Sequence, residues 1–199
     1  MKIACLLLAA GRSTRMQGMN KLLLRVGETS LVKRTATEIA KVDLSEMIAV
    51  TGFEHDKIKK ELKTSPFGIV YNENHMVGMH SSIRKGLEAL KGDCDGFFVC
   101  LSDQPYFTSE TLRTLIGAFE QSGSREKIFY PTFNGERGQP VLIGADFRLE
   151  ILQHEDGDHG CTYLFEKYKD VALPVQVTTS LKDIDRPQDY QAYLENSNG

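Results

Sequence analysis

The sequence predicts an α/β fold in which helices flank a mainly parallel β-sheet, and three observations lead to this prediction. Short apolar segments recur along the first half of the chain, and segments with apolar residues at helical spacing lie between them. The chain of 199 residues is 41% hydrophobic. That length is enough for one large hydrophobic core and too short for two domains that each have a core of their own. We therefore predict a single domain spanning residues 1–199.

The first half of the chain alternates strand and helix. Short, continuously apolar runs predict strands at Ile3–Leu8, Met47–Thr51, Gly68–Tyr71 and Gly96–Leu101. Apolar residues at helical spacing predict helices at Leu31–Lys41, His55–Leu62, Met79–Lys91 and Ser109–Gln121. Strands joined through helices run parallel, because the right-handed crossover returns the chain in the same direction. The strands lack polar alternation, which indicates a sheet buried on both faces and a Rossmann-like architecture.

The pattern changes after about residue 127. Lys127–Pro131 and Gln139–Ile143 are strand-like, and the turn-rich segment Asn134–Gly138 between them predicts a small β-hairpin insertion. Two short helices, a strand and a closing helix are predicted in turn at Ala145–Leu152, Cys161–Lys167, Val171–Val177 and Pro187–Leu194. The last residues, Asn196–Gly199, are expected to form a frayed tail.

Charge and composition argue against several classes of partner. Lys and Arg total 24 against 27 Asp and Glu, and the basic residues are spread along the chain, so we expect no nucleic-acid partner. The apolar stretch Ile3–Ala10 is too short for a membrane span and lacks a signal-peptide layout, so we expect no membrane association. The four cysteines include no CxxC pair, which indicates reduced thiols and a cytoplasmic location.

The loop after the first predicted strand suits a polyphosphate. Ligands of open parallel sheets sit beyond the carboxyl ends of the strands, which is where this loop begins. Its sequence matches neither GxxxxGKS/T nor GxGxxG, which disfavours a P-loop and an ordinary dinucleotide loop. An ordinary strand-to-helix turn with solvated charges is the alternative interpretation. Small residues, hydroxyls and basic side chains nevertheless gather here, at Ala9, Ala10, Gly11, Arg12, Ser13, Thr14, Arg15 and Lys21.

Two groups of aspartates are candidate metal ligands. Asp103 follows an apolar run and therefore lies just past the carboxyl end of a predicted strand. Mg²⁺ needs only one or two carboxylates, since water and substrate phosphates complete its coordination. A capping or turn aspartate is the alternative for Asp103. Asp183 and Asp185 alternate with Ile184, which points both carboxylates to one face of an extended segment; helix capping is their alternative.

The stretch LAAGRSTRMQGMNKLLL resembles the signature loop of the MobA-like nucleotidyltransferases, especially the molybdenum cofactor cytidylyltransferase branch. In that family the loop wraps the triphosphate and the base. The resemblance therefore implies nucleotide binding by Leu8, Ala9, Ala10, Gly11, Arg12, Ser13, Arg15 and Lys21. Members with Gly where this chain has Ala10 tend to use GTP, so Ala10 points toward CTP. A similarity to the family's GMGxSL-type segment implies nucleotide recognition by Gly78, Ser81 and Ser82.

Further similarities continue in order to Asp189. Leu101–Pro105 resembles the family's GDQP motif, whose Asp holds the catalytic magnesium, and Asp183–Pro187 resembles its DIDTPED segment. They imply metal binding by Asp103, Asp183 and Asp185, and catalytic roles for Arg15, Lys21 and Asp103. Two more stretches are similar to the family's GxxGHPVLF and GDxGAR, with departures from both. They imply an acceptor site at Gly138, Gln139, Pro140, Asp158 and Gly160.

The resemblance implies a Mg²⁺-dependent transfer, with Mn²⁺ as an alternative cation, from CTP to the phosphate of molybdopterin, with release of pyrophosphate. It also implies a transient contact with a molybdenum hydroxylase. Two alternatives keep this chemistry and change a substrate: a sugar or polyol phosphate as acceptor, or GTP as donor. An alternative of another class is a non-catalytic chaperone that binds molybdopterin or the nucleotide.

Overall fold

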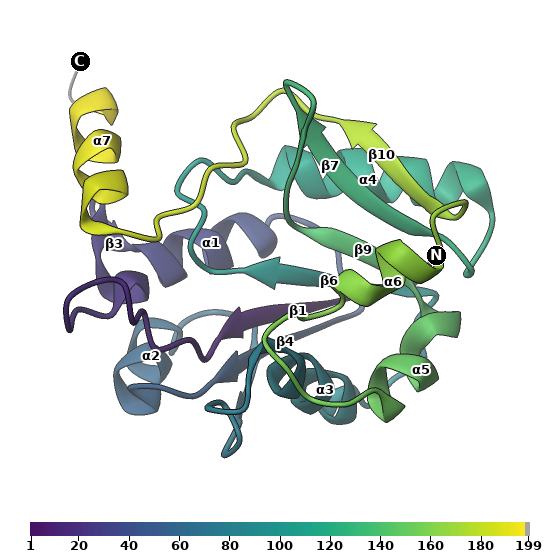
Figure 1. Cartoon of the computed structure of the whole chain (residues 1–199), viewed down its shortest axis with the longest axis horizontal. Coiled ribbons are helices and arrows are strands. Elements are labelled where there is room, and N and C mark those ends of the chain that lie inside the picture. Colours follow the sequence, from purple (N-terminus) through teal and green to yellow (C-terminus); the bar gives the residue numbers. More distant parts are fainter. Residues whose placement is uncertain (198–199) are drawn as a thin grey trace.

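The computed structural model describes residues 1–197, and its centre is a parallel sheet built by the first half of the chain (Figure 1). The predicted strands are present as β1 (Ile3–Ala9), β4 (Glu46–Thr51), β5 (Gly68–Tyr71) and β6 (Gly96–Leu101). β1 pairs in parallel with β4 on one side and with β6 on the other. The sheet order β10-β7-β9-β6-β1-β4-β5 therefore places β1 in the interior of the sheet.

Helices cover both faces of this sheet, which explains its continuously apolar strands. Alternate residues of β1 pack into two separate apolar clusters. One cluster includes α1 (Leu31–Ile39), α2 (His55–Glu61) and α4 (Ser109–Ser122). The other includes α3 (Met79–Ala89), α5 (Arg148–Gln153) and α6 (Thr162–Lys167). The fold is thus a single α/β unit with the predicted helix–sheet–helix layering.

The predicted hairpin forms part of the main sheet. β7 (Ile128–Phe133) and β9 (Val141–Gly144) are its strands, and β9 lies between β6 and β7, antiparallel to both. A shorter hairpin, β7 with β8 (Glu136–Arg137), turns at Asn134 and Gly135, whose φ angles are 51° and 82°. Asn-Gly is the sequence that tolerates this pair of left-handed residues best. β10 (Ala172–Gln176) then extends the sheet beside β7, in parallel.

Several boundaries differ from the prediction. A short hairpin, β2 (Arg25–Val26) with β3 (Thr29–Ser30), and a 3₁₀ turn at Lys21–Leu23 follow the first loop, and such short elements leave no periodic signal. The segment before α5 is a second 3₁₀ turn, Ala145–Phe147. The closing helix α7 (Pro187–Ser197) includes the first half of the predicted frayed tail, whose last two residues lie outside the described range. Within residues 1–197, no helix combines the length and hydrophobicity needed to cross a membrane.

Candidate active site

A cleft of about 480 Å³ opens at the carboxyl ends of β1 and β6. The ends of these strands are tied together, because the buried Ser102 hydroxyl donates a hydrogen bond of 2.7 Å to the carbonyl of Leu8. Ser102 stands where the resembled motif has Gly, and its side chain is accommodated by this hydrogen bond. The predicted residues that line the cleft are Leu8, Ala10, Gly11, Arg12, Ser13, Arg15, Lys21, Gly78, Ser82, Asp103, Asp158, Asp183 and Asp185.

The loop after β1 folds back on itself and presents its basic side chains to the cleft. The backbone N–H of Lys21 donates to the Ser13 hydroxyl at 3.0 Å, and Ser13 adopts a φ of 53°. Met16 is fully buried and anchors the middle of the loop. Arg12 and Arg15 remain exposed, and the guanidinium of Arg15 pairs with Asp185 on the segment before α7. The loop, held by the Lys21–Ser13 bond and the buried Met16, therefore places positively charged side chains at the cleft.

Lys21 lies between two of the predicted metal ligands. Its ammonium nitrogen Nζ is 2.6 Å from Asp103 Oδ2 and 2.6 Å from Asp185 Oδ1. The Lys21 and Asp103 side chains are only 15% and 13% exposed, so water screens this pair weakly. Burial alone lowers the pKa of Lys21, but the charges and hydrogen bonds of Asp103 and Asp185 outweigh it and raise that pKa above its ordinary value. Lys21 is therefore a charged ammonium at neutral pH.

The alternation of Asp183, Ile184 and Asp185 brings the two aspartates to Asp103. The Ile184 side chain is 1% exposed and packs in a cluster with Met16, and its N–H donates to the carbonyl of Asp103 at 2.9 Å. Carboxylate oxygens of the three aspartates lie within 4.8 Å of one another. Partial loss of hydration, followed by the like charges of Asp103 and Asp185, raises the pKa of Asp183. Hydrogen bonds and charges from Lys21 and Arg15 outweigh burial at Asp185 and lower its pKa.

This cluster fits a hard divalent cation. Carboxylate oxygens are the ligands that Mg²⁺ and Mn²⁺ prefer, and a cation so placed also takes phosphate and water oxygens. Oδ1 of Asp103 is buried and has no hydrogen-bond partner within residues 1–197. Buried polar atoms in folded proteins nearly always have a partner, and a bound cation or a water would be one for this oxygen. Asp103, Asp183 and Asp185 are therefore the residues that can hold the metal.

A second wall of the cleft comes from the β5–α3 connection and the start of α3. Ser82 lines the cleft, whereas Ser81 does not, because its hydroxyl bonds the carbonyls of Asn74 and Gly78. The Asn72 side-chain amide donates to the hydroxyls of both serines, at 2.9 and 3.0 Å. Ser81 thus holds the connection in shape, and the sequence did not distinguish its role from that of Ser82. Ala9 also lies outside the cleft, in the core.

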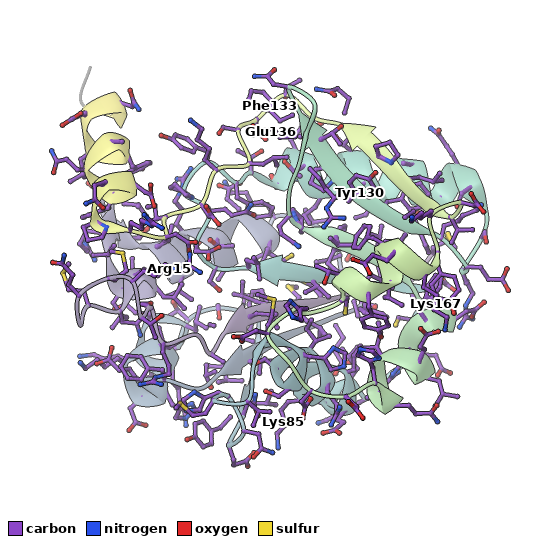
Figure 2. The ribbon with its side chains drawn as sticks, in the orientation of Figure 1. Arg15, Lys85, Tyr130, Phe133, Glu136 and Lys167 are labelled. Atoms are coloured by element: carbon purple, nitrogen blue, oxygen red, sulfur yellow. The ribbon has the colours of Figure 1, made fainter. Side chains whose placement is uncertain are left out.

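The predicted acceptor residues are divided in space. Asp158 lines the cleft, and its loop is tied to α3 because the backbone N–H of His80 donates to the carbonyl of Gly157 at 3.0 Å and the buried His80 ring lies with its two nitrogens 3.0 and 2.9 Å from the carbonyl oxygens of Gly160 and Ile151. Gly160 lies beside Met79 without lining the cleft. Gly138, Gln139 and Pro140 also fall outside the lining. They precede β9, and Gly138 packs against Leu181, close to the β7–β8 hairpin whose tip carries Phe133 and Glu136 (Figure 2).

Some residues that line the cleft were not predicted as site residues. Ser102 and Leu101 adjoin Asp103, and Leu22 follows the first loop. Thr14 also lines the cleft and was expected only as one of the loop hydroxyls that suit a polyphosphate. The remaining ones lie after β5, where the carboxyl end of a third parallel strand was the available signal. They are His75, Met76 and Met79.

Comparison with known proteins agrees with this geometry. The family model of the MobA-like NTP transferase domain matches residues 5–171. The bifunctional protein GlmU of Synechococcus elongatus is 24% identical over 157 residues, which cover 77% of this chain and 35% of that protein. The chain thus spans about a third of the length of the curated relatives it matches.

Solved structures show the same fold. The homologue of Mycobacterium tuberculosis Rv0371c from Mycobacterium sp. strain JC1 superposes with a TM-score of 0.85 at 23% identity, covering 98% of each chain. Rv0371c itself, in complex with manganese, gives a TM-score of 0.71 at 22% identity over 98% of this chain and 99% of that one. The family match extends over most of the sequence and includes both the first loop and Asp103. This chain therefore belongs to the MobA-like NTP transferase family and is a nucleotidyltransferase.

Proposed function

We propose that residues 1–199 act as one nucleotidyltransferase domain that transfers the cytidylyl group of CTP to the phosphate of molybdopterin and releases pyrophosphate. One observation carries the proposal. The triad of Asp103, Asp183 and Asp185 shares a cleft with the basic loop after β1, and the buried Oδ1 of Asp103 has no hydrogen-bond partner among residues 1–197. Nucleotidyl transfer requires this pairing of a cation site with a polyphosphate site.

The basic side chains of the first loop hold the triphosphate in this proposal. Arg12, Arg15 and Lys21 supply positive charge, and the small residues Ala10 and Gly11 allow the phosphates to approach the backbone. Lys21 and Arg15 already pair with aspartates, so they exchange these partners for phosphate oxygens when the substrates bind. Both then offset the charge that develops on the leaving pyrophosphate.

The three aspartates would hold Mg²⁺, or Mn²⁺ as an alternative cation. A cation bound there would supply positive charge to the triphosphate oxygens and Lewis-acid chemistry at the α-phosphorus. The acceptor's phosphate oxygen attacks that phosphorus in line with the leaving pyrophosphate. No side-chain nucleophile takes part, because positioning and electrostatic stabilisation are sufficient for such a transfer.

The remaining predicted residues complete the substrate sites. Gly78 and Ser82, supported by Ser81, belong to the nucleotide site, and the resemblance at Ala10 favours CTP over GTP. Asp158 faces the acceptor, with Gly160 behind it, and the segment Gly138–Pro140 reaches the acceptor beyond the cleft. We place the reaction in the cytoplasm, with the product passed to a molybdenum hydroxylase.

A pyrophosphate-release assay tests this proposal. The purified chain is combined with Mg²⁺, each of CTP, GTP, UTP and ATP, and each of molybdopterin, a sugar phosphate and a polyol phosphate. We expect acceptor-dependent release that is fastest with CTP and molybdopterin. Faster release with another acceptor contradicts the molybdopterin assignment. A preference for GTP contradicts the inference from Ala10 that CTP is the donor. CTP binding without release for any acceptor supports the chaperone instead.

A further inference from the structure

The acceptor of the proposed reaction carries a phosphate, and the cleft lining offers that phosphate no cation of its own. The basic residues that line the cleft are Arg12, Arg15 and Lys21, and all three belong to or follow the first loop, which is assigned to the triphosphate. On the side assigned to the acceptor, the lining residue is the carboxylate Asp158. Two anionic substrates repel each other as they meet, so a further positive group is expected beside the acceptor.

The short strand β8 lies at the edge of the sheet on which the cleft opens. β10 pairs with one side of β7 as far as Thr132, so β8, which pairs Arg137 with Thr132, lies on the other side, toward β9 and β6. Phe129 of β7 is level with Phe98 of β6, because both pair with the same residue of β9. Three residues further along, Arg137 is therefore level with Leu101, which lines the cleft. Two strand spacings, about 10 Å, separate β7 from β6, and β8 lies between them.

Arg137 also shares a face of the sheet with the floor of the cleft. Leu8 and Leu101 line the cleft, and both pack in the apolar cluster that α3, α5 and α6 cover. Phe165 of α6 packs in the same cluster, and the guanidinium of Arg137 lies over its ring. The loop that leads into α6 carries Asp158 at the cleft. The level of Arg137 along the sheet and its face of the sheet thus both place it on the acceptor side.

Aromatic rings, and not a carboxylate, hold the guanidinium of Arg137. Its carbon Cζ lies 4.2 Å from the centroid of the Phe165 ring, which is a cation–π contact, and 5.8 Å from the centroid of the Tyr130 ring. These two rings pack edge to face with centroids 5.4 Å apart, and Tyr130 lies on β7 (Figure 2). Arg137 forms no salt bridge among residues 1–197. A guanidinium stacked on a ring keeps its charge and can donate two parallel N–H groups to one phosphate.

Other basic side chains on this face have partners within the protein. Arg84 of α3 pairs with Asp156, and Lys167 of α6 pairs with Glu150. The charges of these two side chains are therefore compensated by neighbouring carboxylates. The charge of Arg137 is not, so it is available to a ligand.

We infer that Arg137 binds the phosphate of the acceptor and determines part of the acceptor specificity, an inference that rests on the proposed transfer to a phosphorylated acceptor. The contact offsets the repulsion between the two substrates. It also orients the acceptor's phosphate, one oxygen of which bonds to the α-phosphorus while the bond from that phosphorus to the pyrophosphate oxygen breaks. Phe165 is a positioning residue, because it acts by holding the guanidinium. This role does not depend on the rest of the acceptor's structure.

Calorimetric titration tests the role of Arg137 on the full chain, saturated with Mg²⁺ and with the unreactive CTP analogue that has a methylene bridge between its α- and β-phosphates. The two probes are inorganic phosphate, which makes no assumption about the rest of the acceptor, and molybdopterin. The substitution Arg137→Gln removes the charge. We expect it to weaken the binding of both probes about 30-fold, the scale of one hydrogen-bonded contact between charged groups, and to change binding of the CTP analogue less than twofold.

A second pair of variants separates the charge of Arg137 from its placement. Phe165→Leu keeps an apolar side chain in the cluster and removes the ring under the guanidinium, so it should weaken both probes about threefold, the scale of one cation–π contact. In the Arg137→Gln background the same substitution should have no further effect. A purely structural role of Phe165 predicts the same loss in both backgrounds. Arg137→Lys keeps the charge without the planar group and should recover part of the affinity.

Arg113→Gln is the matched control, because Arg113 lies on α4, donates to the carbonyl of Lys41 and does not line the cleft. We expect no change with any ligand. Phosphate and molybdopterin binding that survive Arg137→Gln overturn the inference, as does an equal loss for the CTP analogue. Phosphate binding that depends on Arg137, without molybdopterin binding, upholds the inference and contradicts the molybdopterin assignment. A wild-type chain that binds the CTP analogue but neither probe overturns the inference, whereas one that binds none of the three overturns the proposed function too.

Discussion

The two walls of the cleft differ in charge. On the charged wall, Lys21 and Arg15 are bonded to the aspartates that are proposed to hold the metal. On the other wall, which consists of the β5–α3 connection and the start of α3, the Asn72 amide donates to the hydroxyls of Ser81 and Ser82, and two methionines, Met76 and Met79, are exposed. We therefore expect the charged wall to exchange hydrogen-bond partners when substrates bind, and the polar groups of the other wall to keep theirs. Substitutions on each wall should reveal this difference.

The largest effect is expected from Asp103→Asn. The amide keeps the shape of the side chain and removes the charge that holds a cation, so pyrophosphate release should fall by about 100-fold to 1000-fold, the scale of losing one main electrostatic contact. Asp146→Asn is the control, because Asp146 pairs with Arg125 and does not line the cleft. Circular dichroism should show both variants folded. Asp103→Asn activity within a few-fold of wild type is incompatible with a central role for Asp103.

Lys21→Met tests the two proposed contacts of Lys21, with the triphosphate and with the aspartates, by two different measurements. Loss of a charged hydrogen bond to phosphate should lower kcat/KM for CTP about 30-fold. The same change removes the internal cation from Asp103 and Asp185, so Mn²⁺ should bind the nucleotide-free protein more tightly, by about tenfold. Mn²⁺ titration followed by electron paramagnetic resonance measures the second effect. Unchanged or weaker Mn²⁺ binding argues against the exchange of partners at the charged wall.

Ser81 and Ser82 offer a finer comparison on the other wall. Ser82→Ala should weaken CTP binding a few-fold, because its hydroxyl lines the cleft. Ser81→Ala should leave CTP binding nearly unchanged and lower the free energy of unfolding by about 1 kcal/mol, because the carbonyls of Asn74 and Gly78 lose a donor. Calorimetry and urea unfolding measure the two quantities. Reversed effects of the two substitutions contradict the geometry of this wall.

The smallest effect concerns the repulsion among the aspartates. In metal-free protein at pH 7, Asp183→Asn should raise the free energy of unfolding by about 0.5 kcal/mol or less, because Asp183 is exposed and its repulsion from Asp103 and Asp185 is screened. The gain should shrink in high salt. Saturating Mg²⁺ should reverse its sign, since the variant binds the cation less well. If the free energy of unfolding of Asp183→Asn stays above that of the wild type by the same amount in Mg²⁺, Asp183 is not a ligand of the metal.

The sequence predicted the parts of the molecule that follow from periodicity and topology. Parallel apolar strands place their carboxyl ends at one edge, so the loop with Lys21 and the residue Asp103 were expected to meet there, and they do. The alternation around Ile184 correctly predicted that Asp183 and Asp185 share a face. These inferences depend on local patterns that tertiary packing preserves.

Other features depend on contacts that no local pattern encodes. Ser81 and Ser82 are adjacent and chemically identical, and only the Asn72 amide and the carbonyls around them decide which one lines the cleft. The hairpin strand β9 lies inside the main sheet through pairing with β6, more than forty residues earlier in the chain. Such long-range pairings have no signature in a single sequence.

Electron–nuclear double resonance of the Mn²⁺–CTP complex tests the central claim most directly. The claim is that Asp103 holds a cation against a triphosphate bound by the first loop. It predicts a phosphorus coupling between CTP and protein-bound Mn²⁺ in the wild-type chain, and loss of this protein-bound species in Asp103→Asn. Protein-bound Mn²⁺ that keeps its phosphorus coupling and its affinity in the variant, or wild-type Mn²⁺ with no coupling to CTP, contradicts it.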